Sequence, residues 1–137
     1  MKALLLLCFA VFGNIAAAQA GQASDIKNAL ATTRSHTMAM LSEGDRAVLD
    51  MRYEEALQSS KKVDALLGSA ISDKSLAAVQ PTLKQFNGIW EEFKATRDKE
   101  IIPALFAGER DKARGLAQKV QAGRFKKMNE LLDSLPQ

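Results

Sequence analysis

The chain has 137 residues, long enough for one compact domain, and carries 19 Lys and Arg against 16 Asp and Glu, a net charge of +3. These charges alternate in sign along the chain and form no blocks, so they indicate solvated helix faces and argue against nucleic acid as a partner. The single cysteine, Cys8, lies in a segment that we expect to be removed, so disulfides cannot hold the remaining chain together. The fold must therefore depend on an apolar core.

The first twenty residues have the features of a secretory signal peptide. One cation, Lys2, precedes an apolar run over Ala3–Phe12, and the segment ends in the small-x-small pattern AQA. A glycine and an asparagine interrupt the apolar stretch, which leaves it short for a membrane-spanning helix of ~20 apolar residues. We therefore expect cleavage after Ala20, one domain over residues 21–137, and a periplasmic or secreted protein without a stable membrane anchor.

Beyond this leader, apolar residues recur at three- and four-residue spacing over four long stretches, which predicts an all-α fold. Ser24 and Asp25 have the side chains of an N-cap and are expected to begin the first helix, and Gly44 to end it. Asp45 begins the second helix. Asp73 follows that helix and can cap the third.

The third and fourth helices contain the prolines. Pro81 falls inside an apolar pattern, so the third helix begins afresh near Gln80 or bends there, and Pro103 predicts a second break. Gly108 ends the third helix and Pro136 stops the fourth. The side chains expected to face the core are Leu83, Phe86, Trp90, Phe93, Arg97, Glu100 and Ala104 in the third helix and Ala113, Leu116, Ala117, Val120, Arg124 and Met128 in the fourth.

Four amphipathic helices with short loops predict an antiparallel up-down-up-down four-helix bundle. Two pairs of similar segments suggest in addition that one αα-hairpin has been used twice. LSEGDR (41–46) resembles LFAGER (105–110), and KKVDALLGS (61–69) resembles KKMNELLDS (126–134). Because amphipathic helices use few residue types, chance similarity is the alternative explanation.

Polar residues interrupt the apolar stripes at similar distances from the two loop glycines, Gly44 and Gly108. Both loops of such a bundle lie at the same end, so counting from these glycines places the polar residues in one band, roughly two to three turns along the helices. The count sets His36 opposite Glu100 and Thr33 opposite Arg97. The candidate ligand-binding residues are Thr33, His36, Tyr53, Arg97, Glu100 and, about one turn further on, Arg124.

Two interpretations of this band remain open. In the first it is a small-ligand site, in which Arg97 and Arg124 hold a carboxylate or similar anion with their planar guanidinium groups. His36 or Glu100 would then receive an amine. In the second interpretation the band is an internal network, with Arg97 paired to Glu100 at i, i+3 spacing, that sets helix register and binds nothing.

A haem or copper site is an alternative, because imidazole and thioether groups suit these metals. The fourth helix, GERDKARGLAQKVQAGRFKKM, resembles that of small periplasmic b-type cytochromes with a four-helix bundle, which place an arginine one turn before the axial histidine. Here Arg124 and Met128 take those positions, and Leu30 stands where that family has its axial methionine, so both axial positions depart from the pattern. The other candidate ligands are His36, the single histidine, Met38 and Met40.

No motif of a common enzyme chemistry is present. Outside the leader the sequence has no cysteine nucleophile, and it has no HExxH, no GxSxG and no glycine-rich phosphate loop. One histidine also cannot supply the two Glu-x-x-His pairs of a di-iron bundle. We therefore expect a non-enzymatic protein with no catalytic residue, no metal and no cofactor. A structural or chaperone-like interaction module is a further alternative.

Residues 24–135 resemble the ligand-sensing four-helix domain of methyl-accepting chemotaxis receptors. The similar stretches are MLSEGD, FNGIWEEFKATRDKEI and ALFAGERDKARGLAQKVQAGRFKKMNELLDSL. The resemblance implies a sensor-like periplasmic domain for signal transduction that binds a small anionic or amino-acid-like ligand, or a partner protein, in a bundle that could form a homodimer. Members of that family continue into a second membrane helix and a signalling region. These 137 residues do not include them, so we expect a free-standing domain.

Overall fold

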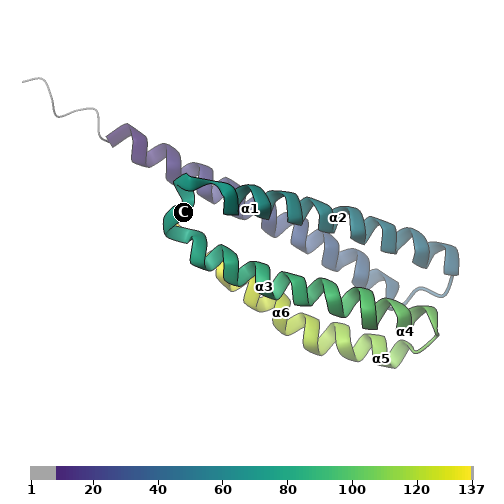
Figure 1. Ribbon diagram of the computed structural model, residues 1–137. Coiled ribbons are helices and arrows are strands. Elements are labelled where there is room, and N and C mark those ends of the chain that lie inside the picture. The colour runs from purple at the N-terminus through teal and green to yellow at the C-terminus, as the bar shows by residue number, and fades with distance from the viewer. Residues whose placement is uncertain (1–8, 137) are drawn as a thin grey trace, which may run out of the picture.

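The computed structural model describes the backbone of residues 9–136 and the side chains of residues 19–136, and every regular element in this part is helical. Four long helical segments lie alongside one another (Figure 1), which confirms the prediction of an all-α protein with four helices. The first two segments are α1 (Phe9–Met40) and α2 (Arg46–Ser72). The third comprises η1 (Lys74–Val79), α3 (Gln80–Thr96), η2 (Arg97–Ile101) and α4 (Ile102–Phe106), and the fourth comprises α5 (Arg110–Gly115), η3 (Leu116–Val120) and α6 (Gln121–Asp133).

The four segments are neighbours in a ring. α1 packs along α2 and α3 along α6, while α2 also contacts α3 and α1 also contacts α6 (Figure 1). The loops after α1 and α4 lie together, because Arg110 at the start of α5 reaches the backbone of the first loop. We call this the loop end of the molecule and the opposite one, near η1, the open end.

α1 is longer than the sequence predicts. It begins at Phe9, so Ser24 and Asp25 lie within a continuous helix, and the prediction of an N-cap there is wrong. The residues before them are rich in alanine, the strongest helix former, which lets the helix run through the predicted cleavage point after Ala20. In Figure 1 the first turns of α1 extend beyond the other helices. Cleavage there stays a prediction. Among the described residues no helix is both long and apolar enough to span a membrane.

The predicted boundaries at Asp45, Asp73, Pro81 and Gly108 are confirmed. The predicted ends at Gly44 and Pro136 are a few residues late, because α1 ends at Met40 and α6 at Asp133. Asp45 Oδ1 accepts hydrogen bonds from two backbone N–H groups in the first turn of α2, at 2.8 and 3.1 Å. Asp73 caps η1 by accepting from the backbone N–H of Ser75 at 2.9 Å. Pro81 lies in the first turn of α3, where its missing N–H costs nothing. Gly108 adopts a φ of 78° directly after α4, a conformation that glycine tolerates best.

Two π-turns, η2 and η3, interrupt the α-helical hydrogen bonding of the third and fourth segments. In η2 the N–H of Ile102 donates to the carbonyl oxygen of Arg97, five residues earlier. In η3 the N–H of Gln121 donates in the same way to Leu116. Pro103 is the second residue after η2 and has no N–H to donate, so the break predicted at this proline takes the form of a π-turn. η3 contains no proline.

Each π-turn inserts a residue into the helical repeat and rotates the buried stripe by one position. Glu100 is consequently exposed, and its neighbour Ile101 is fully buried. In the fourth segment Val120 is 42% exposed, while Gln121 is 3% exposed and takes the inward position. The inward orientations predicted for Glu100 and Val120 are therefore wrong, because the prediction assumed an uninterrupted α-helix.

Two apolar clusters fill the interior. The loop-end cluster consists of Met40, Leu41, Leu49, Ile101, Ile102, Ala104, Leu105, Ala113 and Ala117. The open-end cluster is larger and is built around three aromatic rings of α3, with Trp90 stacked on Phe93 at a centroid distance of 5.7 Å. Its members include Ile26, Leu30, Val63, Leu67, Leu76, Leu83, Phe86, Met128, Leu131 and Leu132.

The two loops hold each other through one arginine each. Arg110 donates to the carbonyl oxygen of Leu41 at 3.4 Å and to that of Glu43. In the opposite direction, the guanidinium of Arg46 lies 4.0 Å from the centre of the Phe106 ring. Arg46 and Arg110 are the last residues of the similar segments LSEGDR and LFAGER, so an arginine at the end of each segment reaches across the loop end.

We expect Arg110→Ala to lower the free energy of unfolding by about 1–2 kcal/mol, because two carbonyl groups lose a charged donor. Arg46→Ala should cost only about 0.5 kcal/mol, since its side chain is 67% exposed and contributes mainly a cation–π contact. Chemical denaturation of both variants measures the difference. Equal losses of stability would show that the hydrogen bonds of Arg110 add nothing to the contact between the two loops.

Candidate functional site

A layer of buried polar side chains separates the two apolar clusters. Each of its members is at most 6% exposed, and all four segments contribute to it. Thr96 and Arg97 lie where α3 meets η2, and Gln121 follows η3, so both π-turns border the layer. π-turns of this kind are frequent at functional sites. The members of this polar layer are Thr33, Thr37, Ser60, Thr96, Arg97 and Gln121.

Arg97 is the charged residue of the polar layer, with 1% of its surface exposed. Its Nε and Nη2 donate to the two carboxylate oxygens of Asp98 at 2.6 and 3.2 Å, and its Nη1 donates to Ser60 Oγ at 2.5 Å. The hydroxyl of Tyr53 donates to Asp98 at 3.3 Å. Burial, and then the negative charge of Asp98, raise the pKa of Tyr53. The guanidinium of Arg97 thus has a carboxylate partner within the chain.

Arg124 joins the polar layer from its edge. Its Nη1 donates to Thr96 Oγ1 at 2.8 Å and to Gln121 Oε1 at 3.2 Å, while its Nε lies 3.3 Å from Glu92 Oε2. Gln121 in turn donates to the carbonyl oxygen of Phe93 at 2.8 Å. The Glu92 side chain is 66% exposed. Solvent-exposed ion pairs are weak, so another anion can replace this carboxylate at small cost.

His36 and Glu100 lie outside the polar layer. His36 Nδ1 is 3.0 Å from Glu55 Oε2, the same oxygen that accepts from Arg52 at 2.9 Å, so the histidine belongs to an α1–α2 surface cluster. Glu100 is exposed on η2. The structure therefore does not bring His36 and Glu100 together, although counting from the loop glycines set them opposite each other.

Two buried polar atoms beside each other in the sequence have no hydrogen-bond partner, Thr33 Oγ1 and Arg34 Nε. The Thr37 hydroxyl, one turn further on, donates to the carbonyl oxygen of Thr33 at 3.2 Å, as helical threonines commonly do toward the preceding turn. The guanidinium of Arg34 lies 4.7 Å from the centre of the Phe125 ring on α6. Unpaired buried polar atoms are rare in proteins, so these two are candidates for contact with a bound molecule.

Of the predicted site residues, Thr33 and Arg97 lie in the polar layer, and Tyr53 and Arg124 reach it through hydrogen bonds. Sequence reasoning missed four members of the layer and Arg34. Two of those members, Thr37 and Ser60, interrupt the apolar stripes of the first two helices and could have been found there. Of the other two, Gln121 was hidden by η3, whereas Thr96 precedes η2 and lies beside the stripe that was predicted to contain Phe93 and Arg97.

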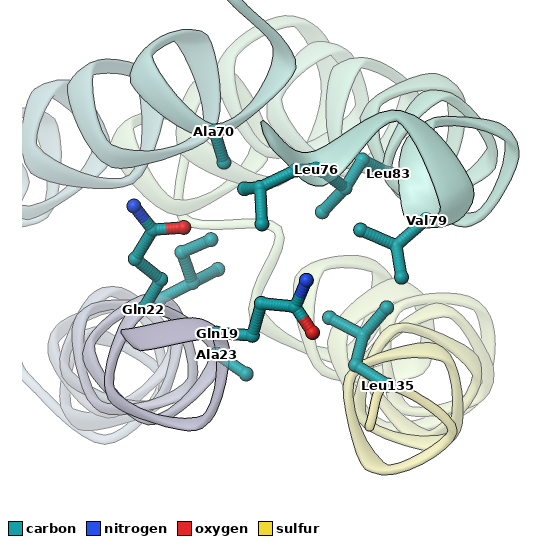
Figure 2. A pocket seen from close by; sticks show the side chains of 9 residues that line it. Gln19, Gln22, Ala23, Ala70, Leu76, Val79, Leu83 and Leu135 are labelled. Atoms are coloured by element: carbon teal, nitrogen blue, oxygen red, sulfur yellow. The ribbon is translucent and has the colours of Figure 1, made fainter. Parts of the chain in front are cut away.

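A pocket at the open end is a second candidate site (Figure 2). Two glutamines of α1, Gln19 and Gln22, lie opposite apolar side chains there, and Gln22 Oε1 is buried without a hydrogen-bond partner. The enclosed volume is about 10 Å³, roughly what one water molecule requires. The pocket is therefore too small for an organic ligand. Its lining also includes Ala23, Ile26, Ala70, Leu76, Val79, Leu83 and Leu135.

The side chains of the haem or copper alternative lie apart. Met40 belongs to the loop-end cluster and Met128 to the open-end cluster, and the polar layer lies between them. His36 is paired with Glu55 near the surface. Within the described residues no group of three His, Cys, Asp or Glu side chains is arranged to hold a metal ion. Among the described residues, His36, Met40 and Met128 therefore lie in three different places.

Comparisons with known proteins identify no relative: no family model matches the chain, and no curated protein or solved structure matches it. The class of the protein is therefore defined by its fold and its candidate site alone. It is an all-α protein of four helical segments with an arginine-containing polar layer between two apolar clusters.

Proposed function

We propose that the chain is a secreted or periplasmic, non-enzymatic, sensor-like protein that binds a small anionic or amino-acid-like ligand at its polar layer. The observation that carries this proposal is the placement of Arg97 in, and Arg124 against, a buried layer bordered by two π-turns. Burying a charge costs roughly several kcal/mol of lost hydration free energy. Apolar side chains of similar volume would fill the layer without this cost. A binding role gives a reason for the arginines.

We further propose an antiparallel up-down-up-down bundle built from a duplicated αα-hairpin. The reciprocal contacts of Arg46 and Arg110 across the loop end support it. So does the burial of equivalent residues in KKVDALLGS and KKMNELLDS. Val63 and Met128 are both fully buried in the open-end cluster, and Leu67 and Leu132 are each 2% exposed there.

The two arginines differ in how readily they could receive a ligand. Asp98 binds two nitrogens of the buried Arg97, and such bidentate pairs are strong, so a ligand would not easily replace it. Arg124 meets its carboxylate partner at an exposed edge. An anion from solvent would therefore replace Glu92 at Arg124 first and gain Thr96 and Gln121 as neighbours.

The leader pattern supports export, and the resemblance to chemoreceptor sensing domains supports a role in signal transduction, with a homodimer or a partner protein as the receiver of the signal. A partner protein that binds the bundle directly is the second form of this proposal. Size-exclusion chromatography at several protein concentrations tests the homodimer.

A thermal-shift screen of amino acids and small carboxylates tests the ligand. An acid present at about 100 times its Kd should add about 2.7 kcal/mol of stability and raise Tm by several degrees. Arg124→Ala should abolish this shift. Lys126→Ala, at an 81% exposed position of the same helix, should keep it. A shift that survives Arg124→Ala would remove the polar layer as the binding site. A Soret band or stoichiometric copper in the purified protein would favour the alternative function instead.

A further inference from the structure

Arg34 is a cation without an anionic partner in the described part of the chain. Its Nε is buried and unbonded, and its guanidinium contacts the Phe125 ring. The neighbouring Thr33 is completely buried, and its hydroxyl has no partner either. Two adjacent residues of α1 therefore present hydrogen-bond donors that nothing in the described structure satisfies, although buried donors in proteins are nearly always paired.

The proposed duplication provides a comparison for this position. LSEGDR begins at residue 41 and LFAGER at residue 105, so Thr33 is equivalent to Arg97 and Arg34 to Asp98. In the second half, Arg97 and Asp98 form a complete guanidinium–carboxylate pair. In the first half, an arginine stands where the second half has its carboxylate, and no acidic side chain among the described residues forms an ion pair with it.

Charge pairing changes along the seam between α1 and α6. Lys27, seven residues before Arg34 on the same side of α1, forms an ion pair with Asp133 of α6 at 2.7 Å. At Arg34 the seam offers the face of the Phe125 ring in place of a carboxylate. A guanidinium that stacks on a ring keeps its N–H edge free, and that edge is where a carboxylate binds.

We infer that the α1–α6 seam beside Thr33 and Arg34 binds the carboxylate group of a small acid. The Arg34 guanidinium donates from its free edge and the Thr33 hydroxyl donates to the same group, so both unsatisfied atoms gain an acceptor. An ionised carboxylate has acceptor sites for both donors and supplies the charge that Arg34 lacks, whereas water supplies no charge. This inference rests on the proposed function and adds a second carboxylate-binding contact, in the α1–α6 seam, to the one proposed at Arg124.

The test is a ¹⁵N–¹H titration of the full chain with sodium acetate against sodium chloride at equal ionic strength, observing the arginine Nε–H resonances. The Arg34 Nε–H signal should move and saturate with acetate and not with chloride. The Arg97 Nε–H signal should stay in place, because its proton is already bonded to Asp98. A wild-type titration needs no variant to fold. A motionless Arg34 signal up to about 100 mM acetate, far above the Kd that a charge-assisted pair supports, would overturn the inference.

Three variants sharpen the result. Arg34→Met should remove the acetate-dependent shift of the Phe125 backbone amide. Thr33→Val, which keeps the side-chain shape, should weaken acetate binding about tenfold through the loss of one hydrogen bond to a charged group. Arg114→Met, at a 48% exposed position on α5, should bind acetate as the wild type does.

The outcomes separate this inference from the proposed function. If the acid found in the thermal-shift screen stabilises Arg34→Met as much as the wild type, but not Arg124→Ala, the seam is wrong and the polar layer stands. If acetate moves the Arg34 signal and raises Tm, but no amino acid or other acid in the screen binds more tightly than acetate, the seam binds carboxylates and the proposed sensor function is wrong. Acetate shifts that persist in Arg34→Met overturn the seam.

Discussion

Asp98→Ala is expected to lower the free energy of unfolding by about 3 kcal/mol, a larger loss than that caused by removing its buried partner with Arg97→Met. The asymmetry follows from exposure. The Arg97 side chain is 1% exposed and the Asp98 side chain 34%. Deleting the carboxylate leaves a guanidinium charge inside the protein, where Ser60 is its only other partner in the described structure, and an uncompensated buried charge costs about 3–5 kcal/mol.

Arg97→Met should cost about 1 kcal/mol or less, because Asp98 and Ser60, the two partners of Arg97, each keep another hydrogen-bonding partner. Asp98 can be hydrated at its exposed edge, and the Ser60 hydroxyl still donates to the carbonyl oxygen of Ala56 at 2.8 Å. Methionine also fills most of the space left by the arginine stem. Guanidinium chloride denaturation of the two variants and of the double variant gives the answer, with the double variant expected to recover most of the stability lost in Asp98→Ala.

The reverse order, with Arg97→Met the more harmful change, would mean that water or another acceptor reaches the guanidinium when Asp98 is absent. The polar layer would then be more open than its burial indicates. That result would also favour Arg97 over Arg124 as the first arginine to meet a ligand, so this comparison tests the stability and the accessibility of the layer together.

The helices were predictable where their patterns are local. Asp45, Asp73, Pro81 and Gly108 act at single turns, through a cap, a missing N–H or a positive φ, and the structure uses each of them as the sequence indicates. The start of α1 was not predictable in this way. An N-cap residue can begin a helix only if the preceding residues leave the helical conformation, and an alanine-rich segment gives them no reason to do so.

The polar layer was predictable only as far as the α-helical repeat holds. Thr33 and Arg97 were found because no irregularity separates them from the stripes used to place them. Within η2 the repeat is displaced by one residue, which moves Glu100 out to solvent. A π-turn depends on backbone hydrogen bonding in the packed segment, and the sequence contains a hint of it only at Pro103.

Arg34 illustrates a different limit. On the sequence it is one more charged residue on the polar side of an amphipathic helix, and such residues are ordinarily solvated. Its importance depends on what it lacks, since its Nε is buried beside Phe125 with no acceptor. A missing partner is a property of the packed neighbours, so only a structure can reveal it.

Trp90→Ala is expected to be the most destabilising single change in the open-end cluster, with a loss of about 3–5 kcal/mol in the free energy of unfolding. The side chain is fully buried, stacks on Phe93, and donates its indole N–H to Asp64 Oδ1 at 2.7 Å. Truncation removes a large apolar volume from a cluster to which all four segments contribute. Thermal and chemical denaturation measure the loss.

Trp90→Phe separates packing from hydrogen bonding. Phenylalanine retains most of the apolar contacts, and Asp64 keeps a hydrogen bond from Lys94 Nζ at 2.8 Å, so its carboxylate is not left without a partner. The loss should therefore be about 1–2 kcal/mol, the sum of a smaller ring and one hydrogen bond. If Trp90→Phe were as harmful as Trp90→Ala, the link from α3 to Asp64 of α2 would outweigh packing in holding these two helices together.

The Arg34 Nε–H response to acetate should be unchanged in Trp90→Phe, because the polar layer and the α1–α6 seam do not use this side chain.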